Sequence, residues 1–253
     1  MNNDKQIECL RYDARAQSIL ATQSSSVEIV STFGASAISS IFRAPYIYYE
    51  QCIRNYITQD HDVLEIGSGT GLHTYALAQT GAWVVASDIS RHSLEVLSQR
   101  IGGVATQVAD MASLPFADNT FDVVNCAGSL SYGEPDSVDS EIRRVLRPGG
   151  IFLCVDSLNH NPIYRFNRYF HCVKGDRTKS TVLRMPTLQR IQLISQGFKS
   201  AEVRFFGAVT YLMPVLASIV GPSNAAKVSD AVDRLLRVRR AAFKFVLVAI
   251  GRL

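Results

Sequence analysis

Hydrophobic positions in the middle of the chain change their spacing several times, and each change separates a short apolar run from an amphipathic stretch. Apolar runs bounded by turn residues are typical of buried strands, whereas apolar residues recurring every three to four positions indicate helices. Strands are predicted at 63–66, 83–88, 105–109, 121–126 and 151–155. Helices are predicted between them at 73–80, 93–100 and 137–146. This alternation predicts βαβ units and a parallel sheet.

The flanking segments contain more helix than strand. Helices are predicted before the core at 5–19 and 45–57, and after it at 162–171, 187–196 and 225–238. A polar loop is predicted at 174–181, and two further strands are predicted at 198–206 and 242–251. The Arg-Pro-Gly-Gly run at 147–150 is predicted to end the helix before it and to separate it from the next strand. No Pro-, Gly- or Ser-rich linker divides the chain, so a single domain over 1–253 is predicted. Its parts are an N-terminal helical lid (1–59), a cofactor-binding core (60–155) and substrate-side insertions with the last two strands (156–253).

Composition excludes several classes of protein. With 253 residues, of which 47% are hydrophobic and 19% charged, the chain can bury a sizeable core and is not a disordered protein. The N-terminus is polar and lacks an apolar segment after a basic start, which argues against a secretory signal. Five scattered cysteines without CxxC spacing predict free thiols in a reducing cytoplasm and no metal site.

The net charge of +4 conceals an asymmetry between the two parts of the chain. Residues 1–150 contain 10 Lys and Arg against 17 Asp and Glu, whereas residues 151–253 contain 16 against 5. Such a split is typical of a basic region with an anionic partner, such as a phosphate, a nucleic acid or a membrane surface. It is equally typical of a domain that balances its own field across a cleft.

The strongest chemical signal follows the first predicted strand. Gly67, Gly69 and Gly71 form a glycine-rich turn, with Glu65 two residues before it and Asp88 at the end of the next strand. Glycines let the backbone approach a ligand that a Cβ would exclude, and an acidic residue at the next strand end can accept two ribose hydroxyls. The spacing differs from the dinucleotide fingerprint, and no Gly-Lys-Ser/Thr follows, so a phosphate-binding loop is not indicated. A nucleoside ligand at the carboxyl edge of the sheet is predicted.

This pattern resembles the class I S-adenosylmethionine-dependent methyltransferases, in particular the small-molecule, type 11-like branch. Three further segments match the family in order: Ala109–Met111, Leu114–Asp122 and Leu146–Gly150. The resemblance implies an α/β, Rossmann-like three-layer sandwich with a seven-stranded, mostly parallel sheet in the order 3-2-1-4-5-7-6. It also implies N-terminal lid helices and helical insertions after strands five and six. The implied cofactor is S-adenosyl-L-methionine, bound by Glu65, Gly67, Ser68, Gly69, Gly71, Asp88, Ile89, Asp110, Met111 and Ala127.

Residues for the methyl acceptor are predicted from two sources. The resemblance implies that Tyr12 belongs to a lid helix and that Ser129 and Tyr132 face the substrate cleft. Helical spacing places Tyr164, Arg168 and His171 on one face, and an arginine beside aromatics suits phosphate or carboxylate pairing. An amphipathic helix with aromatics in the core is the alternative interpretation.

A general base is the remaining catalytic candidate. His160, just past the fifth strand, is the first candidate to remove a proton from the acceptor, and His171 is the second. The alternative for His160 is a helix cap or a surface position.

Together these features predict an enzyme that methylates the oxygen of a sugar or sugar conjugate in a polysaccharide or secondary-metabolite pathway. The alternatives are C- or N-methylation in quinone or natural-product biosynthesis, and a non-catalytic S-adenosylmethionine-binding module. A small-molecule or glycoconjugate acceptor is expected, in a monomer or homodimer. Nucleic acid is not expected, because residues 125–130 lack the Asn/Asp-Pro-Pro-Tyr/Phe signature of base-amine methyltransferases.

An uncharged stretch, 205–226, raises the question of membrane contact. A spanning helix needs about 20 apolar residues, and the prolines and glycines here disfavour one. A hydrophobic lid over the substrate cleft is predicted instead, in a cytoplasmic protein. Two alternatives remain: a peripheral contact with an anionic membrane, and a helix pair packed on the domain with a solvated basic face. The basic residues in question are Arg234, Arg237, Arg239, Arg240 and Lys244.

Overall fold

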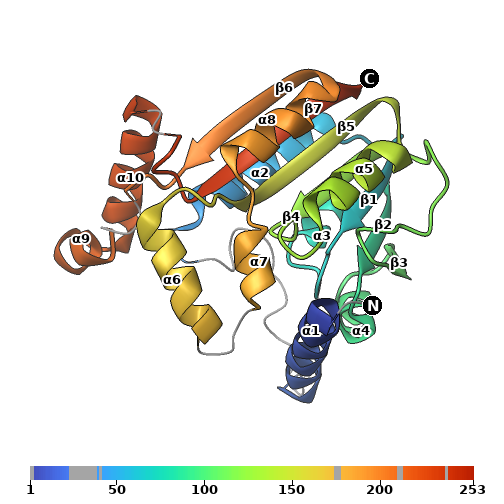
Figure 1. The fold of residues 1–253 in the computed structure, drawn as a ribbon, viewed down its shortest axis with the longest axis horizontal. Coiled ribbons are helices and arrows are strands. Elements are labelled where there is room, and N and C mark those ends of the chain that lie inside the picture. The colour runs from blue at the N-terminus through green and yellow to red at the C-terminus, as the bar shows by residue number, and fades with distance from the viewer. Residues whose placement is uncertain (1–2, 23–38, 40–41, 174–177, 210–212, 237–238) are drawn as a thin grey trace.

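A computed structural model describes residues 3–22, 39, 42–173, 178–209, 213–236 and 239–253. Its centre is a seven-stranded sheet in the order β3-β2-β1-β4-β5-β7-β6 (Figure 1). The strands are β1 (Asp62–Ile66), β2 (Trp83–Asp88), β3 (Ala105–Val108), β4 (Phe121–Ala127), β5 (Leu146–Ser157), β6 (Phe198–Phe206) and β7 (Lys244–Arg252). The first five strands pair in parallel, and β7 runs antiparallel to both β5 and β6. The predicted fold class and strand order are confirmed.

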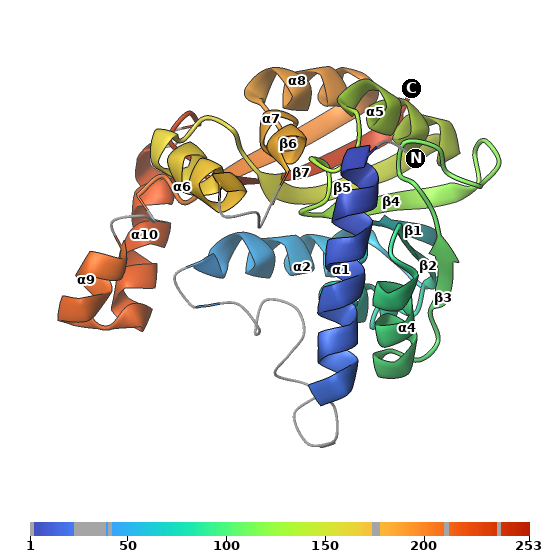
Figure 2. The same cartoon turned by 60° about the horizontal axis from the view of Figure 1, so that its bottom comes forward.

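Helices cover both faces of the sheet, which makes three layers (Figure 2). On one face, α2 (Ala44–Tyr56) and α3 (Thr74–Ala78) bury apolar side chains against β1, β4, β5 and β7. On the other face, α5 (Pro135–Val145) and α8 (Leu188–Gln196) pack on the same strands. A third cluster joins α4 (Arg91–Arg100) to β2. Because strands of a parallel sheet are buried on both faces, they read as the continuous apolar runs found in the sequence.

The beginning of β5 differs from the prediction. The sequence predicts a stop at residues 147–150, yet they lie inside β5, which starts at Leu146. The pairing with β4 shifts register after Phe121↔Leu146, and Gly149 has a φ of +83°. A Cβ on Gly150 would lie 2.9 Å from two backbone oxygens. The Pro-Gly-Gly run therefore makes a bulge within the strand rather than an end to it.

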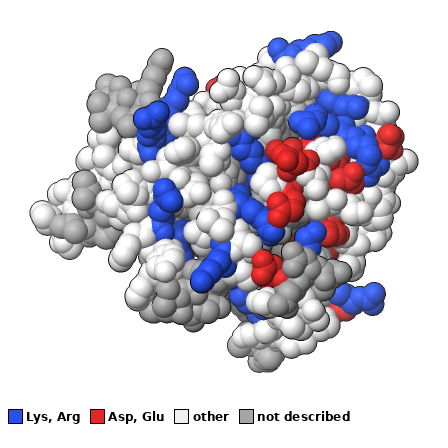
Figure 3. All heavy atoms as spheres, viewed as in Figure 1, with Lys and Arg blue, Asp and Glu red and all other residues white. Residues whose placement is uncertain are grey.

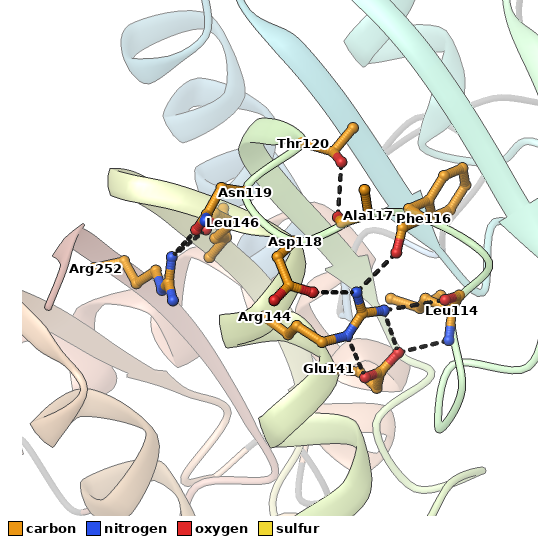
Figure 4. A network of polar contacts seen from close by, with 10 residues as sticks. All are labelled: Leu114, Phe116, Ala117, Asp118, Asn119, Thr120, Glu141, Arg144, Leu146 and Arg252. Carbon is orange, nitrogen blue, oxygen red and sulfur yellow. Dashed lines mark hydrogen bonds and ion pairs between the residues drawn. The ribbon is translucent and has the colours of Figure 1, made fainter.

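A polar network fixes the loop that leads into β4 (Figure 4). The Arg144 guanidinium donates to the carbonyl oxygens of Leu114 and Phe116, at 3.0 and 2.7 Å, and to the carboxylates of Asp118 and Glu141. Glu141 Oε2 in turn accepts the Leu114 N–H at 2.6 Å. One arginine of α5 thus satisfies the backbone of an irregular loop, which explains why this loop is ordered without secondary structure.

The expected helical insertions follow β5 and β6. After β5 come α6 (Pro162–Val173) and α7 (Lys179–Leu183), so the predicted polar loop 174–181 contains the start of a short helix, and residues 174–177 lie outside the description. Thr178 caps α7 by accepting the Thr181 N–H, which explains the extra turn. Between β6 and β7, α9 (Met213–Val220) and α10 (Pro222–Leu236) pack on each other.

The uncharged stretch divides among several elements. It begins in β6 and continues through α9 into α10, and no described helix is long and apolar enough to cross a membrane. In Figure 1 this helix pair stands at the end of the sheet, beyond α6 and away from the N-terminal helix α1 (Asn3–Thr22). Of the basic residues placed beside it, Arg239 and Arg240 are exposed, and the side chains of Arg234 and Arg237 lie outside the description. Lys244 is buried, which contradicts its expected place on a solvated basic face.

The charge asymmetry is visible on the surface. In Figure 3 the acidic residues gather on the right half of the face shown, over α5 and the neighbouring loops, where they are interspersed with Lys and Arg. The left half, over α6 and α10, shows Lys and Arg with very little acidic surface.

Candidate functional site

A cavity of about 770 Å³ opens at the carboxyl ends of β1, β2 and β4, with α1 along its other side. Its lining contains twelve of the seventeen residues predicted for cofactor, acceptor or catalysis. These are Tyr12, Glu65, Gly67, Ser68, Gly69, Asp88, Ile89, Asp110, Met111, Ala127, Ser129 and Tyr132. Four predicted residues, Gly71, His160, Tyr164 and Arg168, are not part of that lining, and the side chain of His171 lies outside the described residues. The structure therefore assembles the predicted site largely as one surface.

The glycine turn has three different local functions. Gly67, at φ +66°, lies so close to β4 that a Cβ would be 2.4 Å from the Ser129 Cβ. Gly69, at φ +54°, has open space where its Cβ would be. Gly71, at φ +89°, packs instead against Ile101, 2.8 Å from its Cδ1. The first glycine admits the neighbouring loop, the second leaves room for a ligand, and the third lets α4 approach.

Asp88 is held rigidly at the end of β2. Its Oδ2 accepts the Gly69 N–H at 2.8 Å and its Oδ1 accepts the Ser90 N–H at 2.9 Å. Burial raises the pKa of Asp88, and these backbone N–H groups oppose that rise. The carboxylate thus ties the glycine turn to the next strand while it lines the cavity.

Glu65 contributes a second carboxyl group from β1. It is 1% exposed, and Thr74 Oγ1 donates to its Oε2 at 2.5 Å. Burial raises the pKa of Glu65 to about 7, because a charged carboxylate is poorly solvated there. A cationic ligand in the cavity would stabilise the ionised form.

Helix α1 is joined to the loops that follow three strands of the sheet. After β2 and β3, Ser90 Oγ donates to Asp13 Oδ1, and Lys5 Nζ donates to Asp110 Oδ2, each at 2.5 Å. After β4, the Tyr132 hydroxyl accepts a hydrogen bond from Tyr12 at 2.6 Å. Helix α1, part of the predicted N-terminal lid 1–59, thus lines the cavity, whereas none of the described cavity lining comes from 205–226, the stretch predicted as a hydrophobic lid.

Tyr46 and His73 are two of the thirteen cavity-lining residues that were not among the predicted site residues. Their rings stack with centroids 5.2 Å apart and planes 7° from parallel. His73 is 5% exposed, and burial together with the positive charge of Lys244 lowers its pKa to about 3. His73 is thus neutral and acts as an aromatic wall. Its position directly after the glycine turn is the sequence signal for it, whereas Tyr46 joins the site only through the packing of α2.

The first candidate base, His160, does not line the cavity. His160 Nε2 accepts the backbone N–H of Leu188 at 3.0 Å, at the start of α8 and not of the helix that directly follows His160. Burial and the charges of Arg240 and Arg165 lower the pKa of His160. The side chain of His171 lies outside the described residues.

The acceptor-side pair from α6 lies next to the cavity. Arg168 lies over the Tyr164 ring, 4.7 Å from its centroid, so the predicted shared face of these two residues is present. Tyr164 is buried, while Phe166 and Tyr169 are 73% and 58% exposed. The aromatics that face away from Tyr164 are therefore not core residues.

One grouping of metal-ligand residue types occurs among the described residues: Cys126, Cys154 and Asp156, all buried. Both carboxylate oxygens of Asp156 already accept backbone N–H groups, from Leu130 at 2.9 Å and Ser157 at 2.5 Å. Cys126 Sγ contacts Ser129 Oγ at 3.0 Å. These ligand atoms are occupied by the protein itself, and we assign no metal to them.

Comparison with known proteins identifies the central segment. Residues 64–154 match the family described as "Methyltransferase domain". Over 108 residues the chain is 41% identical to a demethylmenaquinone methyltransferase of Clavibacter sepedonicus, covering 41% of this chain and 44% of the relative. It is 38% identical over 119 residues to the ubiquinone/menaquinone biosynthesis C-methyltransferase UbiE of Desulfotalea psychrophila, covering 43% and 47%. The match thus spans less than half the length of these relatives.

A solved structure supports the same fold over most of the chain. The geranyl diphosphate C-methyltransferase of Streptomyces coelicolor A3(2), solved with Mg²⁺, geranyl diphosphate and S-adenosyl-L-homocysteine, superposes with a TM-score of 0.56. Sequence identity is 15%, over 82% of this chain and 79% of that one. The predicted resemblance is confirmed at the level of the fold, which is that of the class I methyltransferases, and residues 64–154 match the methyltransferase domain family.

Proposed function

We propose that this protein, whose residues 64–154 form a class I methyltransferase domain, is an S-adenosylmethionine-dependent enzyme that methylates a carbon of a small, quinone-type acceptor. The supporting observation is the set of acceptor groups in one half of the cavity. Glu65, Asp88 and Asp110 line it together with the open face of Gly69. The cofactor offers donors to match: two ribose hydroxyls, an adenine amine and an α-ammonium group.

The residues present suit that cofactor. Asp88 would hold the ribose hydroxyls, Asp110 the adenine amine, and Glu65 would face the cationic amino-acid end. Bound there, S-adenosylmethionine supplies a methyl group on a positively charged sulfur. Closure of α1 through Lys5 and Tyr12 excludes water and keeps the acceptor aligned with that methyl group. Such alignment alone lowers the barrier substantially, since well-oriented partners react with effective molarities of about 10⁵ M or more.

The names of the relatives favour carbon as the acceptor atom. One is a demethylmenaquinone methyltransferase and the other a C-methyltransferase of ubiquinone and menaquinone biosynthesis. Neither name refers to a sugar, so the first prediction, O-methylation of a sugar conjugate, loses support to its C-methylation alternative. In the proposed reaction the ring carbon gains the methyl group, the sulfur–methyl bond breaks, and the ring proton leaves to solvent.

Three titrations and one assay test this function. The purified protein should bind S-adenosylmethionine and S-adenosylhomocysteine in calorimetry and should not bind NAD. With labelled S-adenosylmethionine it should then methylate a 2-prenylated naphthoquinol and leave a nucleotide-activated sugar unmodified. Binding without transfer to either acceptor would favour the non-catalytic module, and transfer to the sugar would restore the first prediction.

A further inference from the structure

A cluster of polar side chains lies behind the acceptor side of the cavity. It brings together Ser157 at the end of β5, Tyr164 and Arg168 on α6, and Lys244 at the start of β7. Ser157 and Lys244 are direct partners in the antiparallel β5–β7 pairing, so the sheet register fixes them face to face. Ser157 Oγ lies 2.7 Å from the Tyr164 hydroxyl, which Arg168 also reaches.

Two cations converge on one neutral oxygen in this cluster. Lys244 Nζ donates to Ser157 Oγ at 3.3 Å, and Arg168 Nη2 donates to the same oxygen at 3.2 Å. Lys244 is 8% exposed and Ser157 is 5% exposed. Burial alone would lower the pKa of Lys244, but Tyr46, Tyr164 and Asp156 raise it, so Lys244 stays positively charged.

The protein supplies little negative charge to balance these cations. Among the described residues, neither Lys244 nor Arg168 forms an ion pair with a carboxylate. The nearby carboxylate, Asp156, accepts the N–H groups of Leu130 and Ser157 and raises the pKa of both Lys244 and Arg168, so one negative charge faces two positive charges. Buried lysines and arginines are rarely left without a counter-charge, because an uncompensated buried charge is costly. A ligand with a negative charge would complete the cluster.

The cluster adjoins the cavity through aromatic residues that belong to both. Tyr46 lines the cavity, and Lys244 Nζ lies 5.0 Å from the centroid of its ring. His73 lines the cavity too, and its pKa responds to Lys244. Tyr132 lines the cavity as well, and it helps raise the pKa of Arg168. The two cations therefore lie close to three of the rings that line the cavity.

We propose that Lys244 and Arg168 form an anion subsite that binds an oxyanion of the methyl acceptor. The oxyanion comes from one of two sources on the acceptor: an ionised ring hydroxyl, or a carboxylate or phosphate substituent. An arginine fork together with a lysine point charge suits either, since both present oxygens that accept several N–H groups. Identifying the ligand as the methyl acceptor rests on the proposed function, whereas the anion preference of the cluster does not.

Naphthalene probes test the subsite by calorimetry, with and without saturating S-adenosylhomocysteine. Three anions are compared with neutral 2-naphthamide: 2-naphthoate, 2-naphthyl phosphate and a nitro-substituted 2-naphthol that is ionised at about pH 8. We expect at least one anion to bind at least tenfold more tightly than the amide. Preference for the naphtholate identifies the ring hydroxyl as the source, and preference for the other two identifies a substituent. Equal binding of all four probes overturns the proposal.

Matched variants test whether Lys244 and Arg168 cause the preference for anionic probes. Lys244→Met and Arg168→Met keep the apolar stems and should each weaken binding of the preferred anion at least tenfold while leaving the amide unchanged. Arg54→Met, an exposed cation on α2, is the control and should change neither. If Arg168→Met does not fold, Arg168→Lys replaces it. Because this variant retains a positive charge, it should keep part of the preference for the anion over the amide. Anion preference that persists in both cation variants overturns the proposal. If wild-type protein binds the anions but not S-adenosylhomocysteine, the proposed function fails and the subsite stands.

Discussion

The two halves of the cavity are built in different ways. The cofactor half consists of backbone and short side chains at the ends of β1, β2 and β4, and its members lie within or next to the glycine turn and Asp88. The acceptor half is formed mainly by long side chains: Tyr12 of α1, Tyr46 of α2 and Tyr132 after β4 line the cavity, and Arg168 of α6 and Lys244 of β7 lie close to it. Of these five residues, Tyr132 alone falls inside the matched segment 64–154. A site made of backbone geometry is tied to particular glycines at particular positions, whereas a site made of side chains can change one residue at a time.

The largest effect on the cofactor half of the cavity is expected from adding a single methyl group at Gly67. In Gly67→Ala the new Cβ would meet the Ser129 side chain at 2.4 Å, at a φ of +66° that L-residues rarely adopt. Left-handed backbone costs about 1–2 kcal/mol, and overpacking costs about 1–3 kcal/mol. We expect a loss of unfolding free energy of that combined size in denaturant titration, with at least a tenfold loss of S-adenosylhomocysteine affinity in calorimetry.

Two further variants separate the backbone strain of Gly67→Ala from its overpacking. Gly102→Ala has open space around its Cβ and no left-handed φ, so it should change stability by much less. Adding Ser129→Gly to Gly67→Ala removes the clashing Cβ and should recover the overpacking part only. A Gly67→Ala protein with unchanged stability and affinity would show that the turn tolerates a side chain.

The same contrast explains which features the sequence predicts. The family resemblance carried by the glycine turn, Asp88 and three further segments implies the order of the strands and twelve of the cavity residues, because local backbone requirements leave a local signature. The run of arginines before Lys244 predicts a basic surface for it, yet the β5–β7 register turns it into the interior. The position of His160 after β5 predicts a base, and the packing of α8 against it is not visible in the sequence. Interactions between distant segments leave no periodic pattern to read.

The second prediction concerns charge rather than shape in the cofactor half. The folded pKa of Glu65 is about 7, against an ordinary value of 4.5, so the folded state binds more protons between these limits. Its contribution to stability is complete below pH 4.5 and is lost as pH rises through about 7. A difference of one between the folded and unfolded pKa corresponds to about 1.4 kcal/mol, so the loss amounts to about 3 kcal/mol.

Glu65→Gln removes this titration. Relative to wild type, the variant should gain unfolding free energy as pH rises from about 4.5 to 7 and should show no further gain above it. Denaturant titrations at a series of pH values measure the difference. Parallel pH profiles for the two proteins would mean that Glu65 ionises normally in the folded state.

The third prediction tests ribose binding at Asp88. Removing a charged hydrogen-bond partner costs about 1.5–3 kcal/mol, so Asp88→Ala should weaken S-adenosylmethionine binding about 10- to 100-fold. Asp88→Asn keeps an oxygen that can accept the Gly69 N–H, so it isolates the charge and should have a smaller effect. Asp60→Ala removes an exposed acid and is the control. Unchanged affinity in Asp88→Ala, measured by calorimetry, would exclude this carboxylate from the ribose site.

The smallest expected effect lies where the two halves meet, at the lid. Tyr12→Phe removes the hydroxyl that donates to Tyr132 but keeps the edge-to-face contact of the rings, whose centroids are 5.6 Å apart. A neutral hydrogen bond contributes about 0.5–1.5 kcal/mol, so dissociation of S-adenosylhomocysteine should accelerate severalfold in stopped-flow measurements. Tyr132→Phe should have a similar effect, and the double variant should add little to either, because both remove the same bond. Fully additive effects would mean that the two tyrosines act separately and that α1 is held closed mainly by Lys5 and Asp110, on the cofactor side.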